Sequence, residues 1–319
     1  MKIVDLKTGK TVESLPGKCV LALGNFDGVH VGHAKLIKLA ADAAKEKGLT
    51  PAVWTFDPDS LSRFGSGSAG RLLNRSDKEY VFASCGADHA VYEDFTRVRD
   101  MSPDEFVRDV LVGSLGCALA VCGFNFTFGR GGAGGPELLK KLMEGYGGGA
   151  VIVPPVKRNG EVVSSSSARS LIEEGRVDEA RVLLGRPYSV TLPVKEGKKL
   201  GRTLGLPTVN QTFDGLYVRP GNGIYATSVC FDGKEYRGVT NVGSRPTVNP
   251  DPSDVNCETH IIGYDGWLYG NDVRISFFKK LRDEKKFADL DELKEAIELD
   301  EKKALAFFES ESEKEKTKE

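Results

Sequence analysis

One stretch near the N-terminus, residues 23–33, constrains this chain more than any other. It reads Leu-Gly-Asn-Phe-Asp-Gly-Val-His-Val-Gly-His. The apolar run before it, residues 19–23, is typical of a buried strand. The apolar pattern after it, residues 36–44, predicts a helix that ends at Gly48. Glycines let the connecting backbone turn tightly and approach a ligand closely. The stretch therefore predicts a strand–turn–helix unit built around a bound group.

The residue types in this turn suit a nucleoside triphosphate. Free N–H groups and a partial positive charge at a helix N-terminus favour phosphate. His30 and His33 are three residues apart, so they share a face on a first helical turn, and we predict that both imidazoles point at the phosphates. The alternatives are an ordinary turn with two surface histidines, or a zinc site. Zinc needs three or four ligands, and no cysteine lies nearby after Cys19.

Size and charge limit the function classes. A chain of 319 residues is expected to form two domains, and 40% hydrophobic with 28% charged residues describes a globular protein with a sizeable core. The net charge of −2 gives no general attraction for nucleic acid or an anionic membrane, so neither is an expected partner. Six cysteines without a C-x-x-C pair, and no apolar leader at residues 1–5, predict reduced thiols in a cytoplasm.

The first half alternates strands and helices. Predicted strands cover residues 19–23, 52–56, 89–92, 118–122 and 150–153. One helix begins at Ser102, where a cap residue, a proline and two acids follow one another. The alternation predicts a parallel sheet with helices on both faces, whose ligands bind beyond the carboxyl ends of the strands. The uncharged stretch 110–129 could span a membrane by length, but its glycines and polar residues predict a helix end, a strand and a loop.

Three further segments fall at the same edge of this predicted sheet. Residues 123–129 carry three alternating phenylalanines, which suit a core as well as a ligand site. Residues 129–134 match G-x-G-x-x-G, but no acidic residue ends the next strand as a dinucleotide fold requires, so we predict a mobile loop. Residues 164–167 are four serines that open a helix, with Arg169 one turn in; the serines could be a cap alone.

Beyond residue 186 the alternation stops. Predicted strands cover residues 188–195, 224–231, 234–239, 256–261 and 272–278. Short strands with Gly- and Pro-rich connections predict a small closed antiparallel barrel. A final helix begins at Asp289, with Glu292 three residues later. We therefore expect domains at residues 1–186 and 187–309, followed at residues 310–319 by a disordered tail that has no apolar side chain.

The densest motif of the second half is residues 201–210, Gly-Arg-Thr-Leu-Gly-Leu-Pro-Thr-Val-Asn. Thr208 and Asn210 are two apart, so on an extended chain they point the same way, and their neutral oxygens suit Mg²⁺ carrying ATP phosphates. The alternative is a turn with a polar pair. Glu258, in a predicted strand, is a candidate base for a primary alcohol, or else a surface glutamate.

These motifs together resemble one family, the bacterial bifunctional riboflavin kinase/FMN adenylyltransferases, also called FAD synthetases. Residues 24–33 are similar to the G-x-F-D-G-x-H-x-G-H motif of the wider nucleotidylyltransferase superfamily. Residues 123–129 resemble the family's G-x-N/D-F-x-F-G segment, and residues 164–169 its S-S-T-x-x-R motif with Ser in place of Thr. Residues 207–210 resemble the P-T-A-N motif of riboflavin kinases, with Val in place of Ala. The resemblance covers nearly the whole chain.

The resemblance implies two ATP-dependent reactions. A C-terminal barrel would phosphorylate riboflavin to FMN. A Rossmann-like N-terminal nucleotidylyltransferase domain would transfer AMP from a second ATP to FMN, giving FAD and pyrophosphate, with Mg²⁺ assisting. Two other classes remain open: a transferase acting on another phosphorylated acceptor, which has no use for a kinase barrel, and a flavin-binding protein without catalysis.

The resemblance also implies site residues. Catalytic roles would fall to Glu258, His30, His33 and Arg169. ATP would be bound by Gly24, Asn25, Phe26, Asp27, Gly28, Gly32, Asn125, Ser164, Ser165, Ser166, Gly197, Lys198, Gly201 and Arg202. Flavin would be bound by Phe56, Asn125, Phe128, Arg282 and Phe287, and the metal by Thr208 and Asn210. One segment departs from the family, since Asp59 lies in a region that usually has a His between two prolines.

Overall fold

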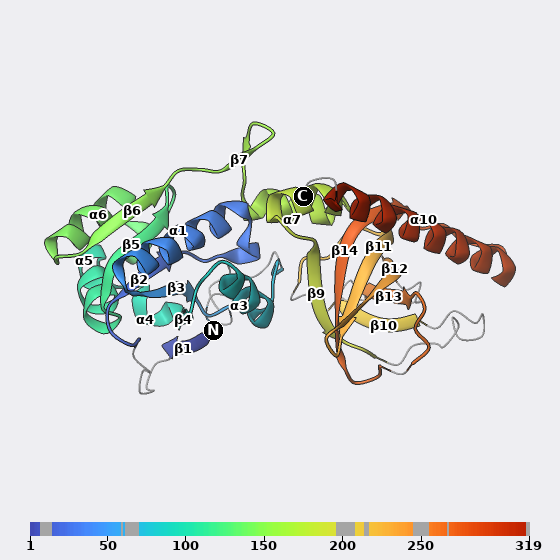
Figure 1. The fold of residues 1–319 in the computed structure, drawn as a ribbon, viewed down its shortest axis with the longest axis horizontal. Helices are drawn as coiled ribbons and strands as arrows, with labels where there is room; N and C mark the ends of the chain where they lie inside the picture. The colour runs from blue at the N-terminus through green and yellow to red at the C-terminus, as the bar shows by residue number, and fades with distance from the viewer. Residues whose placement is uncertain are drawn as a thin grey trace. The chain divides into compact units, whose positions relative to one another are not determined.

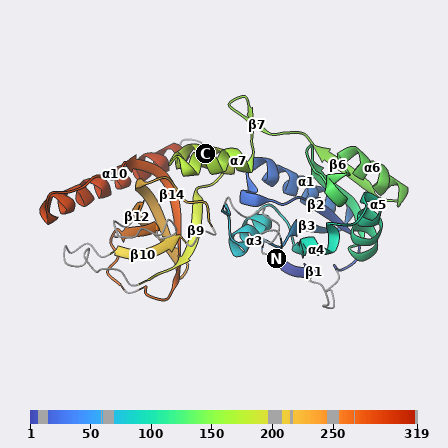
Figure 2. The same ribbon diagram turned by 180° about the vertical axis from the view of Figure 1, so that it is seen from behind.

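The computed structural model describes residues 1–6, 15–58, 60, 70–195, 208–213, 217–244, 255–266 and 268–316. The chain divides into two compact units, residues 1–69 with 75–165, and residues 70–74 with 166–319 (Figures 1 and 2). Helices α7 (Ser165–Glu173) and α8 (Val177–Leu184) therefore lie almost wholly in the second unit, whereas the sequence suggested a boundary at residue 186. Their apolar faces explain this, because they share a core with strands of the barrel.

A six-stranded parallel sheet forms the first unit (Figure 1). Its strands are β1 (Lys2–Leu6), β2 (Cys19–Leu23), β3 (Thr50–Phe56), β4 (His89–Glu93), β5 (Cys117–Gly123) and β6 (Gly149–Val153). They lie in the order β1-β4-β3-β2-β5-β6, so the chain order reverses direction between β2 and β5. Ligands of such sheets bind at this switch point, beyond the carboxyl ends of the strands. Residues 24–33 and 123–129 follow β2 and β5 and meet this edge, as predicted.

Helices cover both faces of the sheet. On one face, alternate residues of β2 share a core with η2 (Phe106–Ser114), a π-helical segment, and with α6 (Pro136–Gly145). The residues between them point to the other face, where α1 (Val31–Lys47) packs on β2, β3 and β5. The first unit also contains α3 (Arg75–Ser84), α4 (Phe95–Val98), α5 (Pro103–Glu105), η1 (Asp27–Val29), η3 (Arg130–Gly132) and the hairpin β7 (Lys157–Arg158) and β8 (Glu161–Val162).

Two sequence-based expectations for this unit are confirmed. Ser102 and Glu105 form a reciprocal capping box at the start of α5, and the uncharged stretch 110–129 divides into a helix end, strand β5 and a loop. The glycine-rich segment 129–134, expected to be a mobile loop, contains the short turn η3. Its backbone is fixed because the N–H of Arg130 donates to the carbonyl of Met101 at 2.6 Å and the guanidinium donates to the carbonyl of Asp100 at 2.7 Å and 2.9 Å.

The second unit is an antiparallel barrel. Its strands are β9 (Tyr188–Pro193), β10 (Thr208–Phe213), β11 (Gly223–Phe231), β12 (Lys234–Ser244), β13 (Val255–Ile261) and β14 (Asp272–Arg282). They are ordered β10-β13-β12-β11-β14-β9. The two edges meet where the N–H of Lys195, just after β9, donates to the carbonyl of Asn210 on β10 at 2.7 Å. The predicted barrel is thus confirmed.

The final helix, α10 (Leu290–Lys316), starts where the sequence indicated but runs further. The Asp289 carboxylate caps it by accepting from the N–H of Glu292 at 2.9 Å. The expected disordered tail at residues 310–319 is wrong as far as Lys316. Glu and Lys favour helix, and the Arg181 guanidinium anchors this turn to α8 through an ion pair with Glu311 at 2.6 Å. Residues 317–319 lie outside the described part.

Candidate active sites

The turn after β2 adopts backbone conformations that residues other than glycine rarely take. Phe26, Gly28 and Val29 all have positive φ, at 51°, 70° and 38°. A left-handed conformation is costly for a bulky or β-branched residue, so surrounding contacts must sustain it. Gly24 also has a packing role, since a Cβ there would lie 3.1 Å from the ring of Phe26. The predicted glycine-rich turn is therefore a strained and closely packed segment.

Three side chains from distant parts of the chain hold this turn by its carbonyl groups. Thr55 at the end of β3 donates to the carbonyl of Asn25 at 2.9 Å, and the Lys78 ammonium of α3 donates to the same oxygen at 3.1 Å. The Ser165 hydroxyl donates to the carbonyl of Asp27 at 2.7 Å. Fixing the carbonyls fixes the peptide planes, and so also the directions of the N–H groups that a phosphate would use.

The two predicted histidines lie together. Their rings stack with centroids 3.6 Å apart and planes 14° apart. His30 is the N-cap of α1, because its Nδ1 accepts from the backbone N–H of His33 at 3.2 Å. Its remaining nitrogen, Nε2, therefore carries the proton of the neutral ring. Gly32 makes room for the stack, since a Cβ there would lie 3.1 Å from the His30 ring. His30 is buried, which argues against the alternative of two surface histidines.

Electrostatics keep His33 neutral. Burial lowers the pKa of His33 well below the usual value, and the electrostatic influence of His30 and of the Lys78 ammonium lowers it further. Its buried Nδ1 has no hydrogen-bond partner among the described residues. His33 is thus a neutral imidazole at pH 7 with an unused nitrogen in the site.

Lys78 is a site residue that sequence reasoning missed. Its side chain is 4% exposed, and it places a positive charge beside the histidine pair. A single lysine in a short helix is normally a surface residue, so the sequence carried no signal for this role.

Other residues expected at the nucleotide are divided between the units. Ser164 and Ser165 belong to the first unit, with Ser165 bound to the turn as described. Ser166 and Arg169 belong to the second unit, in which the Arg169 guanidinium donates to the carbonyl of Gly70 at 3.3 Å. Asn125 is exposed in the loop after β5.

An aromatic pocket of about 330 Å³ lies in the first unit. It brings together two of the predicted flavin residues, Phe56 and Phe128. The remaining lining residues are Trp54, Phe95, Val98, Arg99, Phe106, Phe126, Thr127, Gly129, Gly131 and Gly132. Trp54 meets Phe56 edge to face at 4.8 Å, and Phe126 stacks on Phe128 at 5.8 Å. Such walls suit a flat aromatic ligand. The phenylalanine pattern at residues 124–128 therefore serves a pocket, except for Phe124, which is exposed.

A buried carboxyl group stands beside this pocket. Glu93 ends β4, opposite Phe56 in the sheet register, and its side chain is fully buried. Burial raises its pKa to about 7, although an ion pair with Arg97 at 3.1 Å works in the other direction. The carboxyl group therefore titrates near neutral pH.

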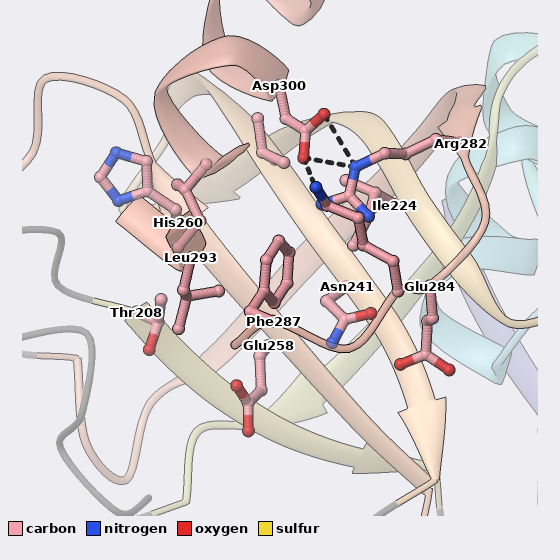
Figure 3. A pocket seen from close by; sticks show the side chains of 13 residues that line it. Thr208, Ile224, Asn241, Glu258, His260, Arg282, Glu284, Phe287, Leu293 and Asp300 are labelled. Atoms are coloured by element: carbon pink, nitrogen blue, oxygen red, sulfur yellow. Dashed lines mark hydrogen bonds and ion pairs between the residues drawn. The ribbon is translucent and has the colours of Figure 1, made fainter. Parts of the chain in front are cut away.

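A second pocket, of about 160 Å³, lies in the second unit between the barrel and α10 (Figure 3). Its polar lining comes from Thr208, Asn241, Glu258, His260, Arg282, Glu284, Lys285 and Asp300, and its apolar lining from Ile224, Val239, Phe287, Leu293 and Ile297. The strand register explains how distant residues meet here. Glu258 of β13 pairs with Asn210 of β10 on one side and with Asn241 of β12 on the other, so the three side chains share one face of the sheet.

This row of side chains fits a hydrated magnesium ion with its phosphate ligands. Thr208, Asn210 and Asn241 offer neutral oxygens beside the Glu258 carboxylate, and the Oδ1 of Asn241 is buried without a hydrogen-bond partner among the described residues. Mg²⁺ is commonly held by few protein oxygens together with waters and substrate phosphates. Within the described ranges, no three His, Cys, Asp or Glu side chains gather as a metal site of their own. Asn241 is a second residue to which sequence reasoning assigned no role, although residues 241–243 follow the order of the family's segments.

Arg282 and Phe287, to which the family resemblance assigns flavin binding, both line this pocket. The Arg282 guanidinium, however, is bound to the carboxylate of Asp300 on α10 (Figure 3). The predicted phosphate contacts Gly197, Lys198, Gly201 and Arg202 lie outside the described residues, as does Asp59.

In the comparison with known proteins, two different family models match successive parts of the chain. A family model described as FAD synthetase matches residues 12–167, and one described as riboflavin kinase matches residues 184–308. The bifunctional riboflavin kinase/FMN adenylyltransferase of Bacillus subtilis is 35% identical over 91% of this chain and 93% of its own length. The protein of the same name from Escherichia coli is also 35% identical, with the same coverage.

A solved structure also matches nearly the full length. A crystal structure titled as a macrolide-efflux protein from Streptococcus pneumoniae is 28% identical, with a TM-score of 0.85, over 95% of this chain and 98% of that one. Among the residues described here, no helix is long and apolar enough to cross a membrane.

Proposed function

The chain belongs to the family of bifunctional riboflavin kinases/FMN adenylyltransferases, and from that premise we propose which residues carry out its two reactions. The protein phosphorylates riboflavin with ATP to give FMN, and it adenylylates FMN with ATP to give FAD and pyrophosphate. We assign the adenylyl transfer to residues 1–186 and the kinase reaction to residues 187–309, although α7 and α8 belong to the second compact unit. We place the enzyme in the cytoplasm.

For the kinase reaction, Glu258 is the general base. The primary hydroxyl of riboflavin gives its proton to the Glu258 carboxylate while the oxygen attacks the γ-phosphorus of ATP, and ADP leaves. The observation that carries this assignment is the Asn210–Glu258–Asn241 row, which gives one carboxylate between two amides on the face toward the pocket. A base needs such a fixed position within hydrogen-bond reach of the hydroxyl.

The metal of the kinase site is Mg²⁺, held by Thr208 and Asn210, with Asn241 as a further candidate ligand. When bound, the ion neutralises phosphate charge and orients the γ-phosphate. The strand register holds Glu258 between Asn210 and Asn241, and the apolar wall, including Phe287, excludes water from the flavin side of the pocket. Gly197, Lys198, Gly201 and Arg202 are proposed as ATP contacts.

For adenylyl transfer, the turn after β2 binds the triphosphate of ATP. Residues 24–28 and Gly32 supply backbone contacts, and Ser164, Ser165, Ser166 and Asn125 supply polar ones. His30 and His33 donate hydrogen bonds to the phosphates as charge moves onto the leaving pyrophosphate, and Arg169 supports them with a charge-assisted bond. The FMN phosphate attacks the α-phosphorus directly, so no covalent enzyme intermediate forms. The flavin ring occupies the aromatic pocket between Phe56 and Phe128.

The test uses one preparation and two substrates. The protein is incubated with ATP, Mg²⁺ and either riboflavin or FMN, and the flavins are separated by chromatography over time. We expect the Glu258→Gln variant to lose FMN formation by about 10²- to 10⁴-fold, the usual contribution of a general base, while FMN is still converted to FAD. The matched control is Glu235→Gln, an exposed strand glutamate of the same barrel. Retention of kinase activity by Glu258→Gln would disprove the assignment of the base.

A further inference from the structure

The two halves of helix α10 make different contacts with the barrel. Its second half is anchored by apolar contacts, in which Ala304 and Phe308 pack into a core with Ile224, Ala226 and Val239. Its first half stands over the pocket and contributes Leu293 and Ile297 to the wall. Asp300 lies between the two halves.

Asp300 makes an unusually complete ion pair for a helix residue. The carboxylate is 2% exposed. Its Oδ2 accepts from the Nε of Arg282 at 2.9 Å and from the Nη2 at 2.7 Å, and its Oδ1 accepts from the Nε at 3.1 Å (Figure 3). The Nη1 of the same guanidinium donates to the carbonyl of Asp283 at 3.0 Å. The Arg282 head is therefore fixed on both sides.

Arg282, the partner of Asp300, directly precedes the segment that forms the other wall of the pocket. Arg282 is the last residue of β14, where it pairs with Ile224 of β11. The segment that follows contributes Glu284, Lys285 and Phe287 to the lining. The Phe287 ring centroid lies 5.8 Å from the Arg282 guanidinium carbon. One ion pair thus joins the end of the sheet, the start of this segment and the middle of α10.

We propose that Asp300 is a positioning residue of the riboflavin kinase site, which fixes Arg282 so that the 282–287 segment and the first half of α10 form a slot of constant width for the flavin ring. Asp300 acts through Arg282 and does not itself touch the reacting atoms. The proposal rests on the proposed placement of riboflavin in this pocket.

The burial of both charges explains why the Asp300–Arg282 ion pair fixes the position of the 282–287 segment. Both groups are largely withdrawn from water, and a buried charge without its partner is strongly unfavourable. Without the carboxylate, the guanidinium must move to another acceptor or to water, and the segment that begins at Arg282 moves with it. The slot would then fit riboflavin less well, whereas Glu258 and the metal-binding oxygens on β10, β12 and β13 would stay in place.

The experiment measures KM for riboflavin, KM for ATP and kcat of FMN formation in Asp300→Asn, which keeps the size of the side chain but not its charge. FMN supplied directly gives the rate of FAD formation in the same preparation, which measures the amount of enzyme with a folded first unit, while kcat and KM for ATP in FMN formation report whether the barrel is folded. Arg282→Lys is the second variant, since it keeps the charge but loses the forked geometry. Glu298→Gln, an exposed position on the same helix, is the matched control.

We expect KM for riboflavin to rise about ten- to hundredfold in Asp300→Asn, the size of effect that follows from losing a hydrogen bond between charged groups. KM for ATP, kcat and FAD formation should change little, and Arg282→Lys should shift KM for riboflavin in the same direction. Three outcomes would overturn the proposal: an unchanged KM for riboflavin in both variants, a fall in kcat alone, or parallel losses of both activities. The proposed placement of the base is tested separately by Glu258→Gln.

Discussion

The two candidate active sites of this chain are built in opposite ways. The site of the first unit centres on a continuous segment, residues 24–33, whose glycines, positive φ angles and stacked histidines all occur within a few residues of one another. The pocket of the second unit is assembled from five strands, a connecting segment and a helix, with lining residues from Thr208 to Asp300. A site formed by one continuous segment can be recognised in the sequence as a motif. A site formed by residues far apart in the chain depends on strand register and helix placement, which the sequence does not show directly.

The comparison predicts that the two sites fail independently. His33→Ala should lower FAD formation from FMN by about 10²- to 10³-fold, the loss typical for one preorganised donor to a developing charge. FMN formation from riboflavin should be unchanged, because every described residue that lines the proposed kinase pocket belongs to the second unit. Both rates are measured by chromatography of the flavins.

A buried histidine elsewhere in the sheet controls for the loss of a core imidazole. His89 begins β4 at the opposite end of the strands from the turn, and its exposure is similar to that of His30. His89→Ala should leave both rates close to those of the unaltered protein. Equal losses of FAD formation in the two variants would mean that His33 matters only for packing.

The second prediction concerns the close packing of Gly32 against the His30 ring within the 24–33 segment. Gly32→Ala would place a Cβ 3.1 Å from the His30 ring and so disturb the imidazole stack. We expect about a tenfold loss of FAD formation, since small displacements of positioned groups cost rate steeply, with FMN formation intact. Gly135→Ala is the matched control, because a Cβ there meets nothing within 4 Å and φ is −112°. If Gly32→Ala is fully active, the stack is not needed for the reaction.

The same contrast explains what the sequence could and could not predict. Period and turn signals predicted the alternation of strands and helices, the helix start at Ser102 and the barrel, because each depends on neighbouring residues. They missed α6 and the hairpin of β7 and β8. They also placed the disordered tail too early, because the contact of Glu311 with Arg181 joins residues that are 130 positions apart.

Site residues follow the same rule. The histidine pair belonged to a motif and was predicted, as was Thr208 with Asn210. Lys78 lies in its site because α3 packs against the turn. Asn241 lies beside Glu258 because of the register between β12 and β13. No local pattern distinguishes such residues from an ordinary surface lysine or strand asparagine.

The smallest expected effect concerns Glu93, a residue of the first unit that belongs to no motif. Its folded-state pKa, about 7, lies above the ordinary value of 4.5. Below pH 4.5 the carboxyl group is protonated in both folded and unfolded states. As the pH rises toward 7, the unfolded state loses its proton first, so the folded state loses stability over this interval. Glu93→Gln cannot ionise and should escape that loss.

We therefore expect Glu93→Gln to be more stable relative to the unaltered protein at pH 8 than at pH 5, by about 2 kcal/mol, because most of the interval between the two pKa values lies between these pH values. Thermal unfolding at the two pH values measures this difference. Glu144→Gln, an exposed residue of α6, should show no such change with pH. A variant less stable at pH 8 would mean that Arg97 holds Glu93 ionised in the folded protein, and that the carboxylate beside the aromatic pocket is a permanent charge.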